Sequence, residues 1–198
     1  RNSILRITVL TERLILAHLG FLLELYDQRG AFPSSAWVPL FEEMVELQER
    51  VYGSVKNYVE WGRNLHHRMR QTMLTPSGST RLRRRSGVMD GCTGGPGYLR
   101  RGYRKPIATW RERRLADPVQ RRLLTRYHEE VFDLCHEECV DDLAALSQVS
   151  TIPELQQTEM ENSQALAEAG DPWQLEQNTE KKAILARFAG RGSVAKNQ

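Results

Sequence analysis

The sequence predicts an all-α protein of six to eight stacked antiparallel helices, arranged as helical hairpins and joined by one long basic, glycine-rich loop. Two observations predict this class. Apolar residues recur at steps of three and four over most of the chain, and no segment alternates convincingly between apolar and polar residues as strands do. The chain has 198 residues, 40% of them hydrophobic and 27% charged, which is an ordinary composition for a globular protein with a substantial core.

The N-terminal third predicts two helices. Residues 3–29 form a mostly buried helix in this interpretation, because their leucines and valines build one wide apolar stripe and Gly30 follows as helix-ending glycines do. Residues 41–69 alternate steps of three and four in a heptad-like seam, which predicts a long helix packed against a partner helix. Gly53 and Gly62 weaken this second helix and leave open a break into two.

The C-terminal half predicts further helices. Helical spacing resumes near Ile107, breaks at Asp117-Pro118 and continues over 119–146. Thr151 is the expected N-cap of the next helix, which carries a proline in its first turn. A last short helix is expected to end at Phe188.

Composition divides the chain into four regions. They are an N-terminal helical hairpin with a long second helix (1–74), a basic Gly-rich loop (75–106), an acidic helical region (107–190) and a flexible tail (191–198). The longest apolar run, 14–23, is about half of what a membrane span needs, so no transmembrane helix is predicted. Whether a cleaved targeting segment precedes Arg1 stays open.

Opposite charges are segregated along the chain. Residues 75–122 hold thirteen Lys and Arg against three acids, whereas residues 127–180 hold fourteen Asp and Glu and no Lys or Arg. The net charge of +3 is too mild for a dedicated nucleic-acid binder. Two interpretations remain: the basic loop folds back over the acidic helices, or the two surfaces face different partners.

The basic loop carries the residues predicted to bind a partner. Arginines offer planar, multi-donor contacts to carboxylates or phosphates, and tyrosines can stack on bases. The bend GCTGGPGYLRRGYRK matches neither the P-loop nor the dinucleotide-binding spacing, so a nucleotide site is not expected. Docking to protein is the first interpretation and contact with RNA phosphates the second. The predicted contact residues are Arg83, Arg84, Arg85, Arg100, Arg101, Tyr103, Arg104 and Lys105.

No catalytic or metal-binding signature emerges. In HEEVFDLCHEEC (128–139), a helix would bring His136 and Cys139 within three positions and Cys135 and Cys139 within four, but no second cluster completes a four-ligand site. His66 and His67 lack a nucleophile with a positioned acid. We therefore predict no metal, no cofactor and no enzymatic activity. Three cysteines without dense spacing favour a reducing compartment.

The stretch YDQRGAFPSSAWVPLFEEM (26–44) resembles the join between the two helices of a pentatricopeptide repeat. Tyr26 and Gly30 keep the spacing of that family, as do Leu40, Phe41 and Met44, although the turn is about two residues too long and the resemblance covers one fifth of the chain. Most members of that family bind organellar RNA, one base per repeat. A short, divergent mitochondrial kind is instead a protein-binding accessory subunit, as in the catalytic head of ATP synthase in euglenozoan protists.

Together these points predict a non-catalytic accessory subunit of a large mitochondrial energy-transducing complex, with ATP synthase as the specific expectation. Its partners would be other protein subunits, and its location the matrix side of mitochondria. The alternative is an organellar RNA-binding or mitoribosomal helical protein whose basic loop contacts phosphates. The partner subunits, the stoichiometry and the order of residues 75–106 do not follow from the sequence.

Overall fold

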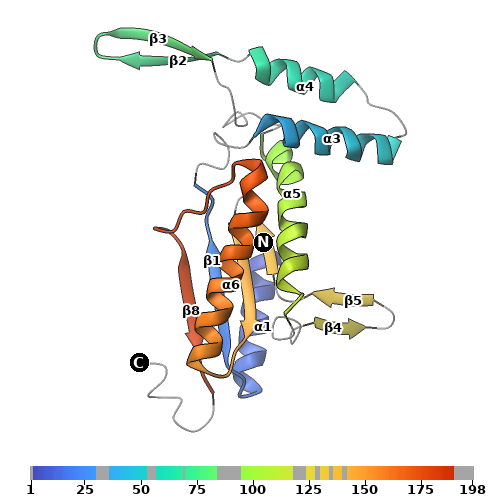
Figure 1. Ribbon diagram of the computed structural model, residues 1–198, viewed down its shortest axis with the longest axis vertical. Helices are drawn as coiled ribbons and strands as arrows, with labels where there is room; N and C mark the ends of the chain where they lie inside the picture. Colours follow the sequence, from blue (N-terminus) through green and yellow to red (C-terminus); the bar gives the residue numbers. More distant parts are fainter. Residues whose placement is uncertain are drawn as a thin grey trace. The chain divides into compact units, whose positions relative to one another are not determined.

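The structure, a computed structural model, describes residues 2–29, 36–52, 57–68, 70–83, 95–117, 124–127, 130–133, 136–139 and 142–189. It is a mixed α/β fold, so the all-α prediction is wrong (Figure 1). In chain order the elements are α1 (Asn2–Leu16), β1 (Phe21–Tyr26), α3 (Trp37–Tyr52), α4 (Asn57–Arg68), β2 (Arg70–Thr75), β3 (Gly78–Arg83), α5 (Gly95–Arg114), β4 (Leu124–Tyr127), β5 (Glu130–Asp133), β6 (His136–Cys139), β7 (Asp142–Gln148), α6 (Ile152–Gly170), the 3-10 helix η2 (Asp171–Trp173) and β8 (Ala183–Arg187).

The chain forms two compact units, each built from segments that are far apart in sequence. The first unit comprises residues 1–28, 107–169 and 177–198, and the second comprises residues 29–106 and 170–176. The tail predicted to be flexible, 191–198, lies outside the described residues. In the part of the chain that is described, no helix combines the length and the apolar character needed to cross a membrane.

A four-stranded antiparallel sheet forms the centre of the first unit, in the order β6-β7-β1-β8. Its two faces are covered by different helices, with α6 on one side and α1 on the other (Figure 1). The α1 side is an apolar core formed by Ile7, Leu14, Phe21, Leu23 and Leu146. Because side chains alternate along a strand, the residues between these on β1 point to the α6 side.

The predicted helix over 3–29 is wrong in its second half, which is strand β1. His18 adopts a positive φ of 55° and ends the helical stretch. A Cβ on Gly20 would lie 2.3 Å from the carbonyl oxygen of Val149, so glycine lets the chain pass close to the end of β7. The run FLLELY is almost entirely buried, and a short apolar run of this kind cannot be told from a buried helix by periodicity.

The same ambiguity explains the error over 119–146. Leu143, Ala145 and Leu146 of β7 are almost fully buried, so this strand shows no polar alternation either. The preceding residues form the short strands β4, β5 and β6. His136 and Cys139 therefore lie on a strand, and the helical spacing that made them a candidate metal pair does not exist. Cys135 lies outside the described residues.

In the second unit the predicted long helix over 41–69 is divided into α3 and α4, and residues 53–56 between them are not described. Phe41 and Met44 are buried on α3, as the heptad-like seam predicts, and Leu40 just before the seam is buried as well. A Cβ on Gly102 would lie 2.1 Å from a methyl carbon of Leu40, so α5 approaches α3 closely at this glycine. The region predicted as a loop, 75–106, contains most of the β2–β3 hairpin and the first half of α5.

The helix predicted after Thr151 is confirmed as α6. The Thr151 hydroxyl oxygen accepts a hydrogen bond from the Glu154 backbone N–H at 3.2 Å, and the Glu154 carboxylate accepts one from the Ser150 N–H at 2.6 Å. The last predicted helix, ending at Phe188, is wrong. This segment is β8, which pairs antiparallel with β1. Of the four tryptophans, Trp37, Trp110 and Trp173 are buried, whereas Trp61 is 59% exposed.

Candidate functional site

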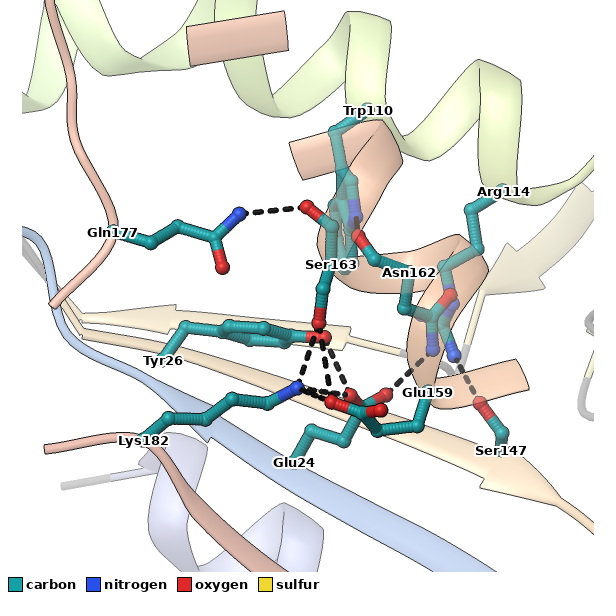
Figure 2. Close-up of polar contacts among 10 residues, drawn as sticks. All are labelled: Glu24, Tyr26, Trp110, Arg114, Ser147, Glu159, Asn162, Ser163, Gln177 and Lys182. Carbon is teal, nitrogen blue, oxygen red and sulfur yellow. Dashed lines mark hydrogen bonds and ion pairs between the residues drawn. The ribbon is translucent and has the colours of Figure 1, made fainter. Parts of the chain in front are cut away.

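A cluster of polar side chains is buried between β1 and α6, and we refer to it as the Glu24 cluster (Figure 2). Its central carboxylate, on β1, is fully buried. The Tyr26 hydroxyl donates a hydrogen bond to one carboxylate oxygen, Oε1, at 2.6 Å, and the Asn162 amide donates to the other, Oε2, at 2.6 Å. The members are Glu24, Tyr26, Glu159, Asn162, Ser163 and Lys182.

Lys182 lies just before β8 and neutralises two carboxylates of the cluster. Its ammonium is 3.2 Å from Glu24 Oε1, forms an ion pair with Glu159, and donates a hydrogen bond to the Ser163 hydroxyl at 2.6 Å. It also lies 4.9 Å from the centre of the Tyr26 ring. The Lys182 side chain is only 12% exposed. Its contacts with Glu24 and Glu159 therefore hold the residues just before β8 against β1 and α6.

Burial dominates the electrostatics of the Glu24 cluster. Desolvation raises the pKa of Glu24, while the hydrogen bonds from Tyr26 and Asn162 and the charge of Lys182 oppose this shift. Desolvation, followed by the charge of Glu24, raises the pKa of Tyr26, which therefore keeps its proton and acts as a donor. The cluster is satisfied by its own members, and its chemistry is that of a buried structural network.

A buried arginine reinforces the same layer of the sheet. Arg114, near the end of α5, is 4% exposed and donates to the Leu146 carbonyl at 2.5 Å and to the Ser147 hydroxyl at 3.0 Å. Its guanidinium lies 5.2 Å from the centre of the Trp110 ring, and the indole N–H of that tryptophan donates to the Asn162 carbonyl. These contacts join α5, α6 and β7 next to the Glu24 cluster (Figure 2).

The strand register places two more carboxylates at neighbouring positions at one end of the sheet, and we call this pair the carboxylate edge. Asp27 directly follows the last residue of β1, and Asp142 is the first residue of β7. Tyr26 is paired with Leu143, so the antiparallel register carries Asp27 and Asp142 to facing positions on neighbouring strands. Asp27 is 24% exposed at its side chain and Asp142 is exposed, so this edge is open to solvent.

Asp27 is held by the segment that leads into β8. The Asn178 amide donates to Asp27 Oδ2 at 2.9 Å, and the Lys181 ammonium lies 3.5 Å from the same oxygen. The Lys181 side chain is 70% exposed, so this ion pair can exchange with a ligand at little cost. Lys181 and Lys182 are consecutive residues just before β8, and they reach Asp27 and Glu24 respectively.

The chemistry of the carboxylate edge fits a hard divalent cation. Mg²⁺ takes oxygen ligands and is commonly held by one or two carboxylates together with substrate phosphates. Asp27 and Asp142 supply two such groups, and Asp141 directly precedes the second in sequence but lies outside the described residues. Among the described residues, no group of three or more His, Cys, Asp or Glu side chains is placed to hold a metal ion.

The eight residues predicted to bind a partner have different environments. Arg83 lies on β3 and its guanidinium donates to the His67 carbonyl at 3.2 Å. Tyr103 is 3% exposed, Arg104 is exposed, and Lys105 lies 3.5 Å from Glu43 and 3.4 Å from Glu46. Arg100 and Arg101 belong to α5, whereas Arg84 and Arg85 lie outside the described residues. The structure therefore does not gather these residues into one described surface.

Sequence reasoning missed both the Glu24 cluster and the carboxylate edge. Glu24 interrupts an apolar run, and a lone acid in such a run is the available signal for a buried polar network. Asp27 and Asp142 are separated by more than a hundred residues and become neighbours only through the strand register. Asp142 belongs to the acidic region 127–180, and nothing in the local sequence marks it as the first residue of a strand.

Comparison with known proteins gives structural relatives only. No protein-family model matches the chain, and no curated protein matches it by sequence. The solved structures that share its fold include two of telomerase. Apo telomerase from Candida tropicalis, truncated from its C-terminal domain, matches with a TM-score of 0.62, at 15% identity over 95% of this chain and 36% of that one. Telomerase from the same organism in complex with a TWJ fragment of telomeric RNA matches with a TM-score of 0.59, at 13% identity over 96% of this chain and 30% of that one. The chain thus spans about a third of their length.

Proposed function

We propose that this chain is a polymerase-type domain that carries out metal-dependent nucleotidyl transfer with an RNA-containing substrate. The observation that carries the proposal is the carboxylate edge, where Asp27 and Asp142 face each other at an exposed end of the central sheet. The shared fold with telomerase, one structure of which contains RNA, favours a nucleic acid as the partner. Carboxylates holding divalent ions at phosphoryl groups are the recurrent machinery of polymerases and nucleases.

The roles of the chain's own residues follow from their contacts. Asp27 and Asp142 would hold a divalent ion, which would supply charge stabilisation at the phosphoryl group. Asn178 and Lys181 orient the Asp27 carboxylate from the segment before β8. The Glu24 cluster keeps that segment in register with β1, because Lys182 is anchored on Glu24 and Glu159. Glu24 and Lys182 are thus positioning residues rather than catalytic ones.

Titration with Mn²⁺, followed by electron paramagnetic resonance, tests the proposed site on the whole chain. We expect saturable binding that strengthens when a nucleoside triphosphate is added, since its phosphates complete the coordination shell. Asp27→Asn and Asp142→Asn should each weaken binding at least about tenfold, because even the loss of a residue that only orients a metal ligand typically costs about 10- to 100-fold in affinity. Glu12→Gln, on the exposed face of α1, is the matched control and should bind Mn²⁺ as the unmodified protein does.

Equal Mn²⁺ affinity of the control and of both aspartate variants would overturn the site. Thermal unfolding of the four proteins without metal separates loss of a ligand from loss of the fold, because only a folding defect lowers the Tm of the apo chain.

The accessory role in mitochondrial ATP synthase, the matrix location and the pentatricopeptide resemblance stay predictions. A native gel of cell extract tests them, since an accessory subunit would co-migrate with a large complex. The proposed function builds on the predicted alternative, an RNA-associated protein, and adds a metal-dependent reaction to RNA binding.

A further inference from the structure

We propose that one face of the β2–β3 hairpin is a phosphate-binding surface for a nucleic-acid strand. The inference starts from the strand register. Arg70 is paired with Arg83, and Thr72 is paired with Arg81. Because paired residues share a face and alternate residues share a side, Arg70, Arg81 and Arg83 all lie on the same face of the hairpin. We call this the tri-arginine face.

The tri-arginine face is exposed and uncompensated by acids. All three arginines are exposed, and the hairpin sequence RQTMLTPSGSTRLR contains no Asp or Glu. Within the described residues, none of the three guanidiniums forms an ion pair, and Arg83 donates a hydrogen bond to the His67 carbonyl. Like charges placed directly opposite each other destabilise a strand pair. The hairpin thus carries a repulsion that a bound polyanion relieves.

The hairpin has no visible structural reason to keep these charges. It is a separate two-stranded sheet, and such ribbons are at best marginally stable alone. Leu74, near its turn and on the same face, is 85% exposed. A row of arginines beside an exposed leucine suits a nucleic-acid strand, since arginines neutralise phosphates while an apolar side chain can contact an unpaired base. A protein partner of acidic character is the competing occupant.

The surface is distinct from the carboxylate edge. The hairpin belongs to the second compact unit, whereas Asp27 and Asp142 belong to the first. The inference rests on the proposed function only in that the partner is a nucleic acid. It adds a binding surface whose loss lowers affinity and leaves divalent-cation binding unchanged.

The test measures RNA binding by fluorescence anisotropy, without divalent cations, at several salt concentrations. The probe is a labelled single-stranded RNA of mixed sequence. The variant Arg70→Gln/Arg81→Gln/Arg83→Gln should bind at least about tenfold more weakly at low salt. The slope of log affinity against log salt should fall by about two, since each single-strand phosphate contact contributes about 0.7. The control Arg13→Gln/Arg50→Gln/Arg187→Gln removes the same charge from other exposed positions and should keep the slope.

A lysine variant distinguishes the loss of positive charge from unfolding of the hairpin. Arg70→Lys/Arg81→Lys/Arg83→Lys keeps the charge and should restore most of the slope, because slope counts phosphates neutralised rather than guanidinium geometry. If the glutamine variant and the control weaken RNA binding equally, binding depends only on the net charge of the protein and the inference is overturned. If poly-glutamate binds as tightly as RNA with the same arginine dependence, the occupant is an acidic protein and the nucleic-acid assignment is overturned.

Failure here and failure of the proposed function are distinguishable. An unmodified chain that binds Mn²⁺ at Asp27 but binds no RNA at low salt overturns the tri-arginine face alone. A chain that binds RNA through these arginines but shows no aspartate-dependent Mn²⁺ binding overturns the proposed catalytic site alone.

Discussion

Glu24 on β1 and Asp27 just after its end are two carboxylates three residues apart, with the same kinds of partner but different exposure to solvent. Each accepts a hydrogen bond from an asparagine amide, Asn162 or Asn178, and each is paired with one of two consecutive lysines. Glu24 is fully buried, whereas the Asp27 side chain is 24% exposed. Depth alone therefore separates a structural ion pair from a carboxylate that is accessible to a ligand.

The comparison shows that the buried and the exposed carboxylate have different requirements for their partners. A buried carboxylate must keep its partners, because leaving it unpaired costs the full desolvation of a charge. A carboxylate at the rim can give up its lysine for a metal ion or a phosphate-bound metal, because exposed ion pairs contribute little. Lys181 and Lys182 show the same division, at 70% and 12% exposure.

The largest expected effect is a difference in the free energy of unfolding between variants of the two lysines, Lys181 and Lys182. Lys182→Met should lower the free energy of unfolding by about 3–5 kcal/mol, because it leaves the buried Glu24 and its neighbour Glu159 without a counter-charge. Lys181→Met should change it by no more than about 1 kcal/mol, since that pair is exposed. Urea denaturation of both variants measures the contrast.

The double variant Lys182→Met/Glu24→Gln sharpens the same comparison. Removing both charges should recover a large part of the stability lost in Lys182→Met, as expected for residues that interact directly. Equal stability of the two single lysine variants would contradict the distinction between the buried and the rim carboxylate.

A smaller effect concerns pH. Burial raises the pKa of Glu24 in the folded protein above its unfolded value. The folded state then holds that proton more tightly, so the contribution of Glu24 is fully present below its unfolded pKa, near 4.5, and is lost as pH rises through the folded pKa. Glu24→Gln cannot titrate. The stability of the unmodified protein relative to this variant should fall with rising pH, by about 1.4 kcal/mol per unit of raised pKa.

Urea denaturation at several values between pH 4 and pH 8 measures this difference, and groups common to both proteins cancel. A relative stability that instead grows with pH would mean that Lys182 and the two hydrogen-bond donors outweigh burial at Glu24.

Local signals in the sequence were sufficient for some elements. The cap at Thr151 identified α6, because an N-cap and its first turn lie within four residues of each other. The seam from Phe41 placed the buried residues Phe41 and Met44 correctly on one helix face. In both cases the pattern that defines the element is contained in the element itself.

The central sheet could not be predicted in the same way. β1 and β7 are covered on both faces, so their apolar residues do not alternate, and a short, mostly apolar run such as FLLELY fits a buried helix equally well. The carboxylate edge depends on that sheet, because Asp27 and Asp142 meet only through the pairing of Tyr26 with Leu143. A site that depends on long-range strand register has no local sequence signature. It cannot be predicted when the predicted fold class is wrong.

The central claim is that Asp27 and Asp142 form the metal site of a nucleotidyl transferase, and incorporation of labelled nucleotide tests it most directly. The substrate is a DNA primer annealed to an RNA template, with Mg²⁺ and nucleoside triphosphates. The account predicts primer extension that requires Mg²⁺ and falls at least about a hundredfold in Asp142→Asn, while Lys181→Met retains the fold and Glu12→Gln retains full activity. A chain that binds the primer–template without extending it, or an Asp142→Asn variant as active as the unmodified protein, would contradict it.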